Sequence, residues 1–105
     1  MSSLRRLRPT RHERDMLRRV VQGYRRAGLR CPALRLVVVE RHPSCDGWAT
    51  SSTIYVERRA LTVELLVHEV AHVIADRVAT HPRAAAHNRL WAVIYGIGYQ
   101  QCIER

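Results

Sequence analysis

The stretch from Val63 to Val78, VELLVHEVAHVIADRV, places the strongest constraint on how this chain of 105 residues can fold. It contains no Gly or Pro, and Thr62 before it can serve as the N-cap. Its apolar residues lie on nearly every side of a helix, and such a helix is stable only inside a core. The sequence therefore predicts a buried central helix that carries the motif His68-Glu69-Val70-Ala71-His72.

Helices are also predicted at both ends of the domain. Thr10 and Glu13 form a capping-box pattern that starts an amphipathic helix with arginine on its outer side, and Gly28 ends it. Residues 1–9 are expected to form a basic tail, so that a single domain spans residues 10–105. A last helix is expected over residues 83–100. Its predicted inward face consists of His87, Leu90, Trp91, Ile94 and Gly98.

The middle of the chain is rich in β-forming residues. Residues 34–40 and 53–57 predict two strands, and residues 48–50 predict a shorter strand between them. Turn-forming residues separate these segments, which favours a small antiparallel meander. The expected fold is therefore α+β, with an N-terminal helix, a small antiparallel sheet, the central helix and a closing C-terminal helix.

The positive charge is concentrated at one end of the chain. All 18 basic residues are arginine, and the net charge is +9. Residues 1–30 contain ten arginines and two acids, Glu13 and Asp15, and so carry a net charge of +8 (10 − 2). We expect this segment to contact DNA or another polyanion, with a solvated helix face as the alternative.

The cysteines and the hydropathy pattern indicate in which cellular compartment the protein is expected. Cys31, Cys45 and Cys102 are odd in number and widely spaced, which argues against a disulfide framework and against a cysteine zinc knuckle. No apolar run approaches the roughly 18 residues of a membrane span. Residues 1–10 contain arginines where a signal peptide has an apolar stretch. We therefore expect a soluble, cytoplasmic protein without a membrane partner.

His68, Glu69 and His72 spell H-E-x-x-H, the strongest functional signal in the sequence. On a helix the two imidazoles lie one turn apart on the same face, where both can bind one metal ion. Glu69 lies beside this face and can accept a proton from a water that the metal activates. With six His and six Glu in 105 residues, only about 0.02 chance matches are expected. The alternative is that the three groups are structural.

A catalytic zinc has three protein ligands and one open position, so a third ligand is needed. Asp76 lies too far along the central helix to share the ion with both histidines, and is better placed to accept the ring N–H of His72. Glu104 lies near the C-terminus, where the chain tends to fray. His81 lies in the predicted loop between the last two helices. His87 is preferred over His81, because it begins the inward face of the last helix.

The combination of H-E-x-x-H on a central helix, a preceding β-hairpin and the sequence HNRLW at residues 87–91 resembles the compact zincin metallopeptidases, most of all the SprT-like group. The resemblance implies that His68, His72 and His87 bind zinc and that Glu69 is the general base. It also implies that residues 48–56 provide a strand along which an extended peptide substrate pairs.

The expected function is thus zinc-dependent hydrolysis of peptide bonds in a protein or peptide substrate. Two alternatives stay open: a nucleic-acid-binding module with a structural zinc, and a non-catalytic interaction protein that keeps the fold. Tyr95 and Tyr99 follow His87 on the last helix and can offer a hydroxyl to an oxyanion. Core packing is favoured for both, as it is for Trp48 and Trp91.

Overall fold

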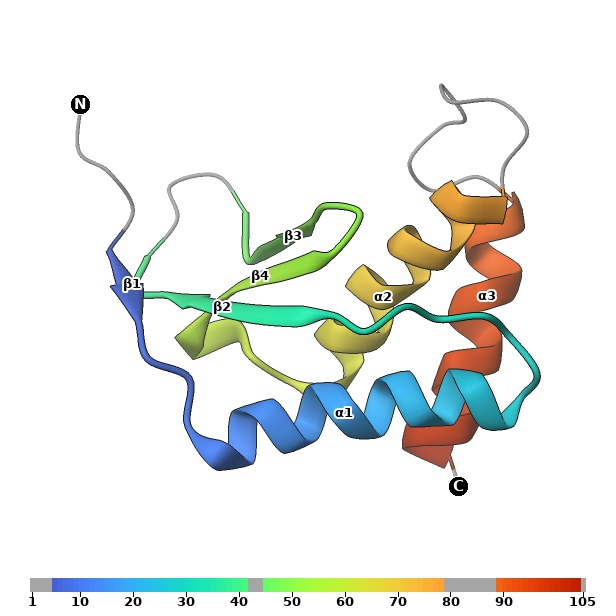
Figure 1. Ribbon diagram of the computed structural model, residues 1–105, viewed down its shortest axis with the longest axis horizontal. Coiled ribbons are helices and arrows are strands. Elements are labelled where there is room, and N and C mark those ends of the chain that lie inside the picture. Colours follow the sequence, from blue (N-terminus) through green and yellow to red (C-terminus); the bar gives the residue numbers. More distant parts are fainter. Residues whose placement is uncertain (1–4, 42–44, 79–88, 105) are drawn as a thin grey trace.

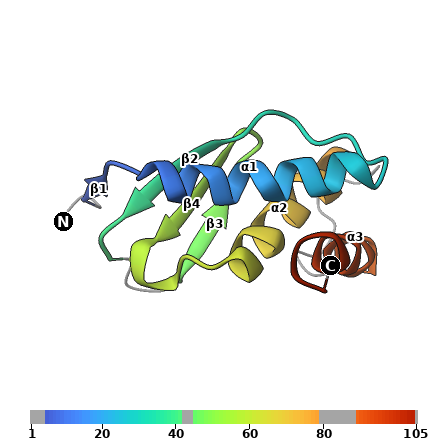
Figure 2. The same cartoon turned by 90° about the horizontal axis from the view of Figure 1, so that it is seen from below.

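The computed structural model describes residues 5–41, 45–78 and 89–104 (Figure 1). Within these ranges the chain forms helices α1 (Arg11–Arg26), α2 (Val63–Val78) and α3 (Arg89–Tyr99) and one four-stranded sheet. The predicted α+β class and the order of its helices are confirmed. Helix α3 lies at the opposite end of the molecule from β1 (Arg6–Leu7) (Figures 1 and 2).

The sheet is mixed, and the predicted antiparallel meander is wrong at its centre. The strand order is β1, β2 (Arg35–Val39), β4 (Thr53–Glu57), β3 (Gly47–Ala49). β1 pairs with β2 and β3 pairs with β4 in the antiparallel sense, whereas β2 and β4 are parallel. The chain reaches the far edge at β3 before β4 returns between β3 and β2. The central position of β4 buries Ile54 and Val56 completely.

Part of the segment assigned to a basic tail belongs to this sheet. Arg6 and Leu7 pair with Val39 and Val38 of β2. The backbone N–H of Glu40 donates to the carbonyl of Arg5 at 3.0 Å. A two-residue strand carries little sequence signal, so only the long-range pairing reveals it.

The predicted capping box of α1 is confirmed and extends into an ion pair. The N–H of Glu13 donates to Thr10 Oγ1 at 3.1 Å, and the N–H of Thr10 donates to Glu13 Oε1 at 2.7 Å. Arg58 donates to both carboxylate oxygens of Glu13, at 3.0 and 2.9 Å. Burial alone would raise the pKa of Glu13, but the hydrogen bonds from Arg58 and Thr10 outweigh it and lower that pKa. Gly28, with φ of +88°, follows the end of the helix.

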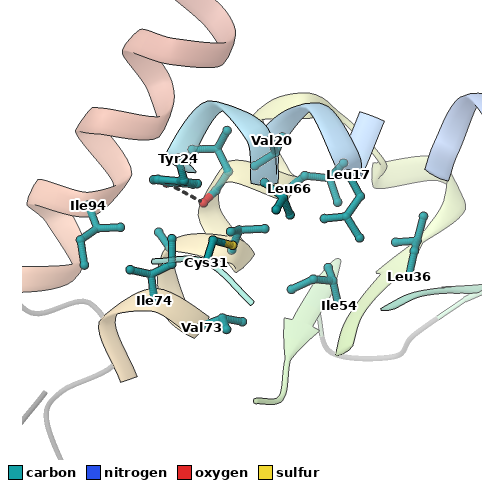
Figure 3. Packing of buried hydrophobic residues seen from close by; sticks show 14 of the residues in the cluster. Leu17, Val20, Tyr24, Cys31, Leu36, Ile54, Leu66, Val73, Ile74 and Ile94 are labelled. Carbon is teal, nitrogen blue, oxygen red and sulfur yellow. Dashed lines mark hydrogen bonds between the residues drawn. The ribbon is translucent and has the colours of Figure 1, made fainter. Parts of the chain in front are cut away.

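The central helix is buried as predicted. Its N-terminus is capped by Thr62, whose hydroxyl accepts from the N–H of Leu65 at 3.0 Å. Side chains from the three helices and the sheet meet around it in one core (Figure 3). The largest fully buried members are Tyr24, Ile54, Leu66, Ile74, Val20, Val38, Val56, Val67, Val70 and Val73.

Helix α3 approaches the core through Gly98. The hydroxyl of Tyr24 donates to the carbonyl of Val67 on α2 at 3.4 Å. A Cβ atom at Gly98 would overlap the Tyr24 hydroxyl and its ring carbon and would lie 2.8 Å from Val67 Cγ1. Glycine at this position therefore lets α1, α2 and α3 pack against one another. This packing sets the distance of α3 from the motif on α2.

The predicted inward face of the last helix is confirmed where the structure describes it. Ile94 and Gly98 are buried, and Leu90 and Trp91 pack on the core. A π-helical turn, Gln100–Glu104, follows α3. The earlier part of the predicted helix, residues 83–88, lies outside the described residues. In the three described ranges, no helix has both the length and the apolar composition that a membrane crossing requires.

Candidate metal centre

His68, Glu69 and His72 converge at one point on α2. Their nearest donor atoms all lie within 4.8 Å of one another, and the two Nε2 atoms of the histidines are 3.3 Å apart. Both imidazoles are partly exposed, so the site is open to solvent. Two imidazole nitrogens and a carboxylate are donors that zinc prefers. This group could therefore hold a metal ion, as the helical spacing predicts.

Glu69 is buried beside the edge strand β3. Only 5% of this residue is exposed. A Cβ atom built on Gly47 of β3 would lie 3.5 Å from Glu69 Oε2 and 2.9 Å from the carbonyl oxygen of Tyr55. The distance to the carboxylate is an ordinary van der Waals contact, whereas the Tyr55 carbonyl is too close for a side chain, so glycine at position 47 permits the close approach of β3 to β4. Burial raises the pKa of Glu69 to about 7.

Trp91 of α3 contacts both histidines. Its indole N–H donates to the carbonyl of His68 at 3.3 Å. The indole stacks on His72 with ring centroids 5.4 Å apart, and meets the edge of His68 at 4.9 Å. Sequence reasoning placed Trp91 on the inward face but assigned it to packing alone. Nothing in its spacing from the motif, 23 residues along the chain, indicated this contact.

Tyr95 continues the aromatic row along α3. It stacks on Trp91 at 5.1 Å and meets the edge of His68 at 6.2 Å. Burial raises the pKa of Tyr95, and the charge of Glu64 and a hydrogen bond with it raise it further. Tyr99 lies beyond Tyr95, with the two rings 6.1 Å apart. Of the two candidate phenols, Tyr95 is the one in contact with a motif histidine.

The structure narrows the candidates for the third ligand. Asp76 is exposed at the end of α2, and Glu104 is exposed in the turn after α3. His81 and His87 lie outside the described residues, so both assignments stay predictions. Over residues 5–41, 45–78 and 89–104, the group on α2 is the one His, Cys, Asp and Glu cluster with metal-binding spacing.

The strand segment that the resemblance assigns to substrate lies next to this site. Residues 48–56 contain most of β3 and β4, and β3 is the edge of the sheet. The rings of Trp48 and Tyr55 stack across the two strands at 4.6 Å, with 2° between their planes. Such a cross-strand aromatic pair stabilises the β3–β4 hairpin.

Comparisons of the chain with protein-family models, with curated proteins and with solved structures find no match.

Proposed function

We propose that this chain is a zinc-dependent metallopeptidase of the H-E-x-x-H type, which hydrolyses peptide bonds in protein or peptide substrates. The observation that carries the proposal is the convergence of two imidazoles and a buried carboxylate within 4.8 Å on one helix. The site would cost free energy of folding if it held no metal, because burying a charged carboxylate next to two imidazoles is unfavourable.

The roles follow from the donor types. His68 and His72 hold the metal through neutral imidazole nitrogens, and the resemblance to SprT-like proteins makes His87 the third ligand. When bound, zinc supplies Lewis-acid activation of a water molecule and of the scissile carbonyl. Glu69 accepts a proton from the attacking water and delivers it to the leaving amine nitrogen. The carboxylate lies beside Gly47 of the edge strand, and burial of Glu69 raises its pKa toward the range in which it can both accept and donate a proton near neutral pH.

The zinc assignment is tested by metal analysis of the full chain purified without a histidine tag. We expect one zinc per chain in the parent, and loss of most of it in His68→Ala and His72→Ala, because two ligands cannot close a stable site. His87→Ala is expected to lose zinc as well, whereas His81→Ala is its matched control and is expected to keep it. Full zinc affinity in His87→Ala, with loss of zinc in His81→Ala, would show that the third ligand is His81 and that His87 does not bind the metal.

A second proposal concerns the arginines of α1, which are favoured for contact with DNA or another polyanion because their side chains lie at the surface. Arg11, Arg19 and Arg26 are all exposed. Helix α1 also supplies Leu17, Val20, Val21 and Tyr24 to the core. A test by truncation is therefore unsuitable, because it would remove part of the core along with the charge.

DNA binding through these arginines is expected to depend steeply on salt. Three phosphate contacts correspond to a roughly 40-fold loss of affinity between 50 and 200 mM salt. Replacing Arg11, Arg19 and Arg26 with Gln should flatten this slope in a fluorescence-anisotropy titration of duplex DNA. An affinity that does not change with salt, or a slope unchanged in the triple variant, would contradict the polyanion proposal. A closed, inert zinc site together with strong DNA binding would favour the nucleic-acid-binding module over the peptidase.

A cytoplasmic location is part of the proposal. It is supported by the cysteine pattern, because Cys31, Cys45 and Cys102 are odd in number and widely spaced. Such a pattern argues against a disulfide framework, which is typical of oxidising compartments.

A further inference from the structure

A cavity between α1 and the start of β2 lies outside the candidate metal centre. Its volume is about 580 Å³, and it is lined by α1 on one side and by residues 33–36 on the other. Helix α1 crosses the molecule along this side (Figure 2). Small-molecule sites in proteins commonly have volumes of about 300–1,000 Å³. The cavity is therefore large enough for one small organic ligand.

The floor of this cavity is aliphatic. Leu17 and Val21 extend from α1, and Leu34 and Leu36 from the opposite wall. Leu17, Val21 and Leu36 are only 4%, 7% and 8% exposed, and Leu34 is partly exposed. A stable protein partner would need about 800 Å² of surface on each side. A floor with so little accessible area is suited to an aliphatic chain rather than to a partner protein.

The rim of the cavity is positively charged. Arg14, Arg18 and Arg25 line it from α1 at positions i, i+4 and i+11, and Arg35 lines it from β2. All four are exposed, and no acidic residue is among the described residues that line the cavity. Arg18 also pairs with Asp15, three residues earlier on α1, and the other three arginines have no acidic partner among the described residues. On a helix this spacing keeps the three α1 arginines on one side, over a length of roughly 16 Å.

Two of these guanidinium groups are held in place by backbone carbonyls. Arg14 Nη1 donates to the carbonyl of Pro9 at 2.9 Å. Arg25 donates to the carbonyl of Cys31 from Nε and Nη2, at 3.0 and 2.8 Å. A guanidinium has five N–H donors, so these bonds orient each group and use only part of its donors. Planar donors arranged in this way match the two oxygens of a carboxylate.

We propose that this cavity binds one molecule of a single-chain anionic amphiphile, a fatty-acid-like carboxylate whose tail lies on the aliphatic floor and whose headgroup pairs with the arginine rim. The positive charge of the rim favours an anionic headgroup. The aliphatic floor favours a hydrocarbon tail. Phosphates of DNA would use the rim but leave the floor empty. The proposal is independent of the metallopeptidase proposal, because none of the residues involved contacts the metal centre.

The test is calorimetric titration of the full chain with dodecanoate below its micelle concentration. We expect one dodecanoate per chain and no comparable binding of dodecyltrimethylammonium, which has the same tail and the opposite charge. The double variant Arg18→Gln, Arg35→Gln is expected to bind dodecanoate about tenfold or more weakly, because two charge-assisted contacts are lost. Leu34→Ser should also weaken dodecanoate binding, because it replaces an aliphatic side chain of the floor with a polar one.

The charge-matched control is the double variant Arg19→Gln, Arg30→Gln. It loses the same two charges, and both arginines are exposed and lie outside the cavity lining. Its affinity for dodecanoate should equal that of the parent, and circular dichroism checks that all variants fold. Three results would each overturn the proposal: no dodecanoate binding, equal weakening in both double variants, and equal binding of the cationic amphiphile. Arginine-dependent binding to phosphatidylglycerol vesicles without binding of free dodecanoate would overturn it too, and would indicate a membrane-surface site.

Discussion

Replacing Glu69 with Gln is expected to lower peptidase activity by roughly 10²- to 10⁴-fold while leaving the zinc content and the fold intact. Glutamine keeps the shape of the side chain but cannot accept the proton of the attacking water. Burial already disfavours the charged form of Glu69 and raises its pKa to about 7, so removing the charge should not destabilise the core. The measurement is turnover of fluorescein-labelled casein by zinc-loaded protein, with zinc content determined on the same sample.

The matched control is Glu104→Gln, the same chemical change at an exposed residue after α3. Its turnover should be that of the parent. Wild-type turnover in Glu69→Gln would refute the assigned role. Loss of zinc in Glu69→Gln would show instead that Glu69 supports the metal site structurally. A parent chain that holds zinc and DNA but cleaves no protein substrate would favour the nucleic-acid-binding alternative.

Gly98→Ala is expected to destabilise the protein by about 2–3 kcal/mol, because the new methyl group overlaps a side chain that cannot move away. Tyr24 is completely buried, and its hydroxyl bonds to the carbonyl of Val67. Helix α3 would have to shift outward to relieve the overlap. For a domain of this size, the loss corresponds to a fall in Tm of about 10 °C or more.

Gly96→Ala is the matched control, two residues away on the same helix. A Cβ atom at Gly96 meets nothing within 4 Å, so alanine should stabilise the helix by about 0.5–1 kcal/mol through its higher helix propensity. The two variants are thus expected to change the Tm in opposite directions in thermal unfolding followed by circular dichroism. Equal shifts in Tm would show that α3 does not pack on Tyr24 as described.

The same pair of variants connects packing to the candidate site. Trp91 lies on α3 and donates to the carbonyl of His68. An outward shift of α3 in Gly98→Ala would withdraw the indole from both imidazoles. We therefore expect weaker zinc binding in Gly98→Ala and unchanged zinc binding in Gly96→Ala.

The sequence by itself determined the features that depend on residues close together in the chain. The capping box of Thr10 and Glu13, the extent of α2 and the shared face of His68 and His72 all follow from helix geometry over a few residues. The type and order of the three helices and of β2, β3 and β4 follow in the same way, because hydrophobic periodicity and turn residues are local signals.

Only the tertiary structure decided which distant segments meet. Strands β2 and β4 pair in parallel because β3, which lies between them in the chain, takes the edge position of the sheet, and no local pattern encodes that order. The contact of Trp91 with the imidazoles and the placement of Glu69 beside Gly47 likewise join different elements. Apolar periodicity shows which face of an element is buried. Which residues of other elements contact that face depends on how the whole core packs.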